Sequence, residues 1–168
     1  MYILALLPFF LQALIIGVDE VYFHHKRGLP KWERIGHPLD TLTVLFCMYM
    51  VVLVPMSAFT LRLYIASAAF SCIFVTKDEF VHKHFCPASE NWLHAMLFTV
   101  HPITLAIAGI IWAGVSDCKT YSWIESWLTN LSFLKSFLVI QAILMSLFFL
   151  YQVIYWNFIW KEKIVIKN

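Results

Sequence analysis

Long apolar stretches alternate with short polar ones along the chain. Five of them approach or exceed the length of about 20 residues that a helix needs to cross a bilayer. They cover residues 1–18, 41–60, 63–78, 91–115 and 132–160. The third is the weakest, because its purely apolar part is short, so the helix must either tilt little or continue through Asp78 and Glu79. The pattern predicts an all-α integral membrane protein with about five transmembrane helices.

Basic residues divide unequally between the two predicted sides of the membrane. With the N-terminus outside, the inner side carries nine of them and the outer side three. The inner set is Lys26, Arg27, Lys31, Arg34, Lys77, Lys83, Lys161, Lys163 and Lys167, and the outer set is Arg62, Lys119 and Lys135. Because loops rich in lysine and arginine stay in the cytoplasm, we expect an outside N-terminus and a cytoplasmic C-terminus, in a plasma or inner membrane.

The composition excludes two broad classes of protein. Hydrophobic residues make up 61% of the chain and charged residues 13%, which is incompatible with an ordinary soluble domain. The formal net charge is only +2 and no contiguous basic surface is evident, so we expect no nucleic-acid partner. The expected surroundings are therefore the lipid bilayer.

Histidines and carboxylates are concentrated in two polar stretches. All seven histidines and seven of the ten acidic residues lie between positions 19 and 101. The first stretch holds Asp19, Glu20, His24, His25, Glu33, His37 and Asp40; the second holds Asp78, Glu79, His82, His84, Glu90 and His94, with His101 further along. Ionisable groups in an apolar chain are costly unless something binds them. A metal centre is the simplest explanation.

The two stretches share an order of residue types that predicts an internal repeat. An Asp-Glu pair ends an inward span in each, a histidine follows six residues after the Asp, and a glutamate then precedes a histidine by four residues. His37 matches either His94 or His101, because both His37 and His101 precede a proline. We expect two hairpins, 1–60 and 61–116, to form a four-helix bundle within a single membrane domain. An outer interfacial segment, 117–131, and a fifth packing helix with a cytoplasmic tail, 132–168, complete the domain.

Helical spacing predicts which side chains converge. Residues four apart share a helix face, and this interval separates Glu20 from His24, Asp78 from His82, Glu33 from His37, and Glu90 from His94. His82 and His84 flank Lys83, so at most one of them points inward if this region is helical; the spacing from Asp78 favours His82, whereas the repeat favours His84. Pro38 is expected in the first turn of the second helix, where its missing N–H costs nothing. Pro102 is expected inside the fourth helix.

Imidazole and carboxylate ligands without thiolate favour iron, zinc or manganese. The candidates outnumber the ligands of one ion, so two ions sharing carboxylates are expected, with iron favoured. The expected ligands are Asp19, Glu20, His24, His25, Glu33, His37, Asp78, Glu79, His82, His84, His94 and His101. Soluble carboxylate-bridged di-iron bundles use Glu-x-x-His, whereas here the interval is Glu-x-x-x-His, so the comparison is an analogy.

The leading functional hypothesis is a metal-dependent membrane oxidoreductase, such as a hydroxylase or desaturase, acting on a lipophilic substrate with the help of an electron donor. A zinc-dependent membrane hydrolase is the second, with Glu90 or Asp40 as general base. A metal transporter and a purely structural protein are the non-enzymatic alternatives. The aromatic residues at the inner end of the last span (Tyr151, Tyr155, Trp156 and Trp160) are expected to form an interfacial belt without a role in the site.

Overall fold

The computed structural model describes residues 2–80, 86–116 and 128–160. Its long helices are α1 (Tyr2–Val18), α3 (Lys31–Leu53), α4 (Ala58–Phe74), α6 (Ala88–Ser116) and α8 (Leu131–Ile154). The π-helix η1 (Asp19–His24) and α2 (His25–Arg27) extend α1, the 3₁₀-helix η2 (Val75–Asp78) extends α4, and the π-helix η3 (Tyr155–Ile159) extends α8. Every element in these ranges is helical, which confirms the predicted all-α class. With their extensions, five helices are long and apolar enough to cross a membrane.

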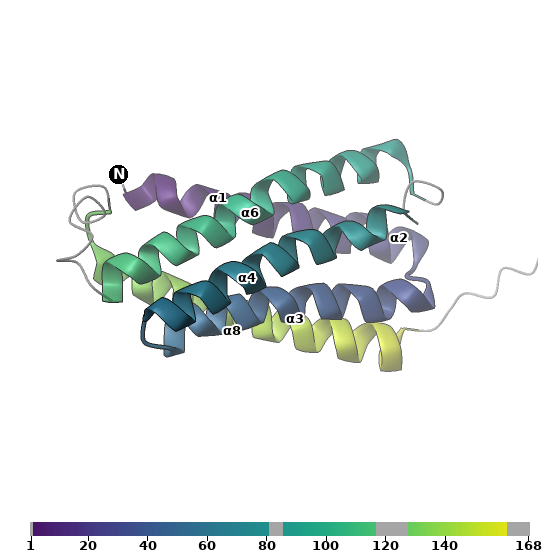
Figure 1. Cartoon of the computed structure of the whole chain (residues 1–168). Helices are drawn as coiled ribbons and strands as arrows, with labels where there is room; N and C mark the ends of the chain where they lie inside the picture. The colour runs from purple at the N-terminus through teal and green to yellow at the C-terminus, as the bar shows by residue number, and fades with distance from the viewer. Residues whose placement is uncertain (1, 81–85, 117–127, 161–168) are drawn as a thin grey trace, which may run out of the picture.

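The long helices lie side by side with roughly parallel axes (Figure 1). The C-terminal ends of α1, α4 and α8 and the starts of α3 and α6 meet at the same end of the molecule, on the right of Figure 1. Consecutive helices are not always neighbours: α1 packs mainly against α6, while α3 packs against α4 and α8. The last helix also contacts α6. It is therefore an integral part of the helix packing and brings its C-terminal residues to the polar end.

The connection between α1 and α3 is shorter than the sequence suggested. Gly28 takes a positive φ of 77°, a conformation that favours glycine, and Pro30 caps α3. As a result α3 begins at Lys31 rather than near residue 41, and the expectation that Pro38 lies in a first turn is wrong. Pro38 lies inside α3 and has no N–H for the carbonyl of Arg34, which instead accepts a long 3.5 Å hydrogen bond from Asn157 Nδ2. Pro102 lies inside α6, as expected.

The apolar core fills the middle of the helix assembly and large apolar side chains also cover its outside. Fully buried residues include Cys47, Met48, Leu105, Ala108, Ile111 and Leu134. Trp112 is buried with them and donates from Nε1 to the carbonyl of Val54 at 3.0 Å.

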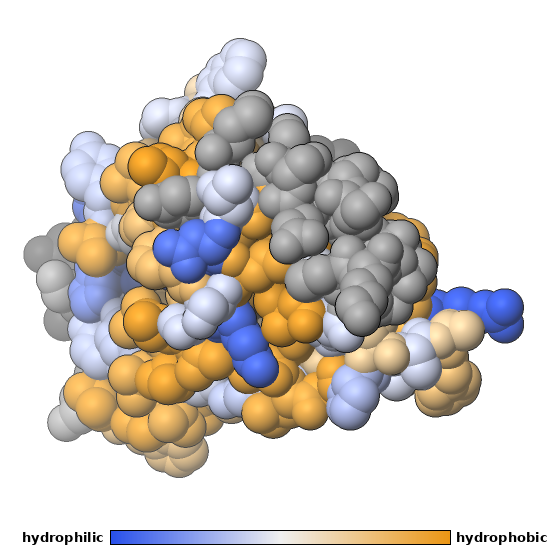
Figure 2. Space-filling model, turned by 90° about the vertical axis from the view of Figure 1, so that its left-hand side faces the viewer, coloured by the Kyte–Doolittle hydropathy of each residue, from blue (hydrophilic) through white to orange (hydrophobic). Residues whose placement is uncertain are grey.

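Outward-facing Leu53, Ile73 and Phe158 are 70%, 72% and 80% exposed. The end-on view in Figure 2 shows that apolar surface also covers much of the end where α1 begins. Exposed apolar surface of this extent is typical of a lipid-facing protein.

A close approach of α4 to α6 gives a first test of this packing. A Cβ atom at Gly109 would lie 2.9 Å from the ring of buried Tyr64, whose hydroxyl donates to the carbonyl of Leu105 at 2.6 Å. A Cβ atom at Gly17 would meet nothing within 4 Å. We therefore expect Gly109→Ala to be less stable than Gly17→Ala by about 1–3 kcal/mol, the usual cost of overpacking. The gain in helix propensity, about 1 kcal/mol, is common to both variants and cancels in the comparison.

The measurement is thermal unfolding of both variants in the same detergent, followed by circular dichroism. Equal midpoints for the two variants would show that α4 and α6 do not approach each other as closely as described.

Candidate metal centre

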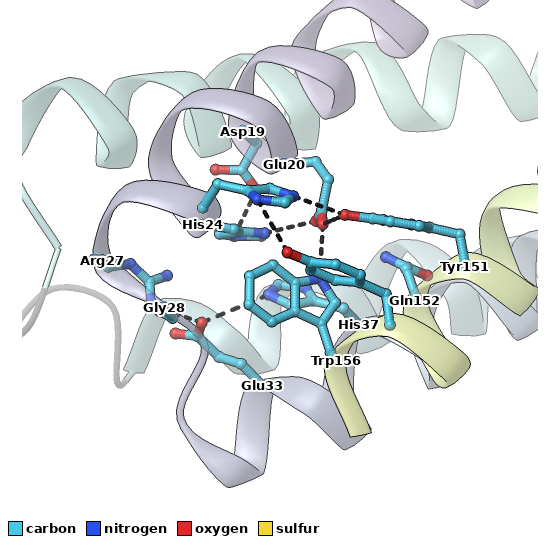
Figure 3. Close-up of polar contacts among 12 residues, drawn as sticks. Asp19, Glu20, His24, Arg27, Gly28, Glu33, His37, Tyr151, Gln152 and Trp156 are labelled. Atoms are coloured by element: carbon cyan, nitrogen blue, oxygen red, sulfur yellow. Dashed lines mark hydrogen bonds and ion pairs between the residues drawn. The ribbon is translucent and has the colours of Figure 1, made fainter. Parts of the chain in front are cut away.

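The π-helical turn η1 brings two carboxylates to one histidine. In a π-helix the backbone bonds run from residue i to residue i+5, so side chains four and five positions apart both lie near one face. His24 accordingly contacts Glu20 Oε2 through Nδ1 at 2.9 Å and Asp19 Oδ2 through Nε2 at 3.0 Å (Figure 3). All three residues are buried. With carboxylate oxygens at both ring nitrogens, His24 is arranged to carry two protons, or one proton and a metal ion.

The starts of α3 and α6 contribute further imidazole and carboxylate groups. The ring of His37 lies 4.8 Å from that of His24, centre to centre, and its Nε2 lies 3.9 Å from Glu33 Oε2. On α6, His94 Nε2 lies 3.3 Å from Asp19 Oδ1. The Glu-x-x-x-His spacing therefore works as the sequence suggested, because it places each pair on the helix face that looks toward η1.

Arg27 joins the glutamates of the two helices. Its Nη1 lies 2.8 Å from Glu33 Oε2 and its Nη2 lies 2.8 Å from Glu90 Oε1. The side chains of Glu33 and Glu90 are 1% and 0% exposed. Gly28 follows Arg27 and lies under Trp160, since a Cβ atom there would be only 2.6 Å from the indole ring. The glycine thus allows the chain to turn tightly enough for Arg27 to reach both carboxylates.

The charges in this cluster balance only if its histidines are protonated or a cation is bound. The four buried carboxylates are those of Asp19, Glu20, Glu33 and Glu90, and Arg27 is the permanent cation in contact with two of them. Unpaired charges are strongly disfavoured away from water. The remaining charge must come from protonated imidazoles or from a bound cation. A divalent cation that replaced imidazolium protons would keep the balance, and its binding would release protons.

Two groups of side chains have ligand atoms close enough to hold a metal ion. One consists of His24, Glu33 and His37, the other of Asp19, His24 and Glu90, and within each group the ligand atoms lie within 4.8 Å of one another. His24 belongs to both. His94 and Glu20 lie beside these groups through their contacts with Asp19 and His24. Seven of the expected site residues are thus gathered at one end of the molecule.

Other expected ligands lie elsewhere. His25 is exposed, with Nε2 2.9 Å from the hydroxyl of Tyr151 and its ring against Tyr155. His101 has a hydrogen-bond partner at each ring nitrogen, Gln12 Nε2 at Nδ1 and Ser71 Oγ at Nε2, both at 3.1 Å. Glu79 is half-buried on the chain that continues from α4. His82, His84 and the side chain of Asp78 lie outside the described residues.

Both expected general bases are held by cations. Each carboxylate oxygen of Asp40 accepts a hydrogen bond of 2.7 Å from the ammonium group of Lys77. Glu90 is held by Arg27, and the thiol of Cys86 donates to Glu90 as well. Burial raises the pKa of the Cys86 thiol to about 12, so the sulfur stays protonated at neutral pH. Either carboxylate must break an ion pair before it can accept a proton.

The last helix supplies two donors that the sequence did not reveal. Tyr151 donates its hydroxyl to Glu20 Oε1 at 2.8 Å, and Trp156 donates from Nε1 to the same oxygen at 2.6 Å (Figure 3). They are five residues apart, and Trp156 lies in the π-helix η3. Their assignment to an interfacial belt is therefore wrong for these two residues. The sequence signal that could have revealed them is that the two aromatic residues lie five positions apart, at the same end of the protein as the carboxylates.

A cavity of about 430 Å³ extends from this cluster into the apolar interior. Its polar end is lined by Asp19, Glu20, His24, His37 and His94, and its far end by Phe9, Phe10, Leu105 and Met145, among others. Such a volume is typical of small-molecule sites. The arrangement places side chains that could bind a metal at the polar end of an apolar chamber.

Comparison of the chain with protein-family models, with curated proteins and with solved structures finds no match. The interpretation of the centre therefore rests on its own geometry.

The hydrogen bonds to Glu20 give a test of the site's construction. Tyr151→Phe removes a donor to a carboxylate, and hydrogen bonds to charged groups contribute about 1.5–3 kcal/mol. We expect the free energy of unfolding to fall by about that amount. Tyr155→Phe is the matched control, because its hydroxyl makes only a 3.4 Å contact with exposed His25.

Chemical or thermal unfolding in detergent distinguishes the two variants. If Tyr155→Phe cost as much as Tyr151→Phe, the bond to Glu20 would not be a specific support of the site.

Proposed function

We propose that this chain is an integral membrane protein that binds divalent metal ions in the cluster around His24 and uses them to oxidise a lipophilic substrate. The observation that carries the proposal is the pair of ligand groups that share His24 and lie among four buried carboxylates. Excess carboxylate charge in an apolar environment favours a bound cation, and mixed nitrogen and oxygen ligands favour iron, zinc or manganese.

The proposed orientation places the cluster at the cytoplasmic side. Lys26, Arg27, Lys31, Arg34 and Lys77 all lie at the end of the helices where the cluster forms. Lysine and arginine near helix ends mark the cytoplasmic face. The N-terminal start of α1 would then face the outside, and the large apolar side chains on the helix exteriors would face lipid.

Two iron ions are the proposed occupants. The cluster offers four carboxylates, the number found in carboxylate-bridged di-iron bundles, and three imidazoles, those of His24, His37 and His94, one more than those bundles use. When bound, such a centre supplies oxygen activation, and the protein contributes the ligands and a dry, shaped cavity. The residues of this chain hold the charge balance, exclude water and position an apolar substrate beside the centre.

The ion pairs make the hydrolytic alternative less favourable. A zinc hydrolase needs a carboxylate that is free to take a proton from a metal-bound water. Asp40 and Glu90, the expected bases, are engaged by Lys77 and Arg27 respectively. Metal transport is also less favourable, because the described residues at the far end of the cavity, such as Phe9, Leu105 and Met145, offer no charged group.

Metal content is the direct test. We expect purified protein, analysed by inductively coupled plasma mass spectrometry, to contain about two iron ions per chain, the number in dinuclear carboxylate sites. His24→Ala should lose at least half of the metal, because His24 belongs to both ligand groups. His25→Ala is the matched control and should keep it, because His25 is exposed and contacts Tyr151 and Tyr155.

Circular dichroism is the check that both variants remain folded. Zinc in place of iron would favour the hydrolase, and protein without metal after reconstitution would overturn the proposal. Equal metal loss in both variants would show that the ligand groups are assigned wrongly.

The charge balance gives a second test. Arg27→Gln leaves Glu33 and Glu90 without their cation, and breaking a buried ion pair costs about 3–5 kcal/mol. We expect the metal-free variant to be destabilised by that amount relative to metal-free wild type. Added divalent metal should restore much of the loss, because a cation that binds only the folded state stabilises it.

The measurement is the thermal midpoint with and without metal. If added metal raised the thermal midpoint of Arg27→Gln less than that of the wild type, this result would argue that the cation site lies elsewhere.

A further inference from the structure

The cavity beside the cluster has the dimensions of a narrow channel. Its lining runs along α1 from Phe9 to Glu20 and along α8 from Gln141 to Gln152. At 1.5 Å per residue, each run is about 16 Å long. The cavity volume of about 430 Å³ is therefore spread along a length of about 16 Å. Such an elongated shape suits an extended hydrocarbon chain.

The channel reaches the molecular surface between α1 and α8. The two helices meet at one level through the rings of Phe10 and Phe137, 5.8 Å apart, and at another through Glu20 and Tyr151. Between these levels their backbones do not pack against each other along their described lengths. The residues there line the cavity and are exposed: Phe10 at 58%, Leu144 at 53%, together with Ala13 and Gly17. This opening is on the apolar flank of the molecule, where lipid is the expected neighbour.

The charged residues along the channel select among head groups. The described residues that line it include Asp19, Glu20 and Asp40 but no lysine or arginine, so an anionic head group would find no lysine or arginine to pair with there. An uncharged polar group needs no such partner.

A second polar feature lies along the channel wall. Gln12 is 7% exposed, donates to His101 and leaves its Oε1 without a hydrogen-bond partner among the described residues. Exchanging the amide oxygen and nitrogen would leave the NH₂ group unpaired instead, so one polar atom of Gln12 needs a partner in either case. A hydroxyl group can donate or accept and therefore satisfies both arrangements.

We propose that the channel binds a single-chain lipid with an uncharged, hydroxyl-bearing polar group, which enters sideways from the bilayer between α1 and α8. This inference rests on the proposed function and names its substrate class, a linear alcohol. Its apolar chain follows the channel, so that a carbon of the chain lies beside the cluster around His24.

Photolabelling in lipid nanodiscs tests the route. The probe is a twelve-carbon alcohol carrying a diazirine in its chain, and labelled residues are located by mass spectrometry. We expect labels on channel residues such as Leu144 and Met145. Ala13→Trp, which fills the opening, should lower this labelling at least about fivefold, the factor that about 1 kcal/mol produces. Leu14→Trp is the matched control, because Leu14 is 63% exposed but does not line the cavity, and its labelling should equal that of the wild type.

A twelve-carbon fatty acid with the same diazirine tests the head-group rule and should label the channel at least about fivefold less. Equal labelling by acid and alcohol would overturn the choice of substrate class, and labelling unaffected by Ala13→Trp would overturn the lateral route.

Metal is measured in the same samples. Normal metal with an unlabelled channel would overturn this inference alone, whereas channel labelling that depends on Ala13 in metal-free protein would overturn the metal proposal and support the route.

Discussion

The burial of four carboxylates at one end of five apolar helices is the constraint on which the rest of the structure depends. Charges away from water must be paired, and several of the pairings here join different elements. Arg27 connects the starts of α3 and α6, His24 joins two carboxylates of η1, and His94 reaches Asp19 from α6. The helix ends therefore have little freedom to separate. The same pairing concentrates nitrogen and oxygen ligands at one point.

Two π-helical turns make this concentration possible. In η1 the π winding lets His24 contact side chains both four and five residues before it. In η3 it carries Trp156 to the same side as Tyr151, so that both donate to one oxygen of Glu20. Irregular turns of this kind cost regular helical hydrogen bonding and are frequent at functional sites. Here both occur at the same end of the molecule and meet at a single carboxylate.

The relation between the cluster and the cavity links structure to function. Along much of its length the channel is lined by apolar side chains such as Phe9, Phe10 and Met145, and it ends at the imidazoles and carboxylates. In this structure His101 is part of the channel wall and is held in a hydrogen-bonded chain with Gln12 and Ser71. Polar atoms inside a membrane protein are satisfied internally. That chain accounts for a histidine deep in a span without a metal.

The sequence by itself determined the class of fold and the approximate positions of the apolar helices, and it singled out the Glu-x-x-x-His pairs as candidate site residues. Each of these follows from local rules, namely apolar length and helical periodicity. The helical turn that places Glu33 and His37 on α3 was less evident, because Gly28 and Pro30 close the connection in so few residues.

Only the tertiary structure separated His24 from His25, paired Asp40 with Lys77, and brought Tyr151 and Trp156 to Glu20. Adjacent histidines are equivalent in sequence, and their difference arises from the winding of η1. The contacts of α8 with η1 join residues more than 120 positions apart, as the 131 positions between Glu20 and Tyr151 illustrate. No local pattern encodes such a contact, because it depends on how the helices pack.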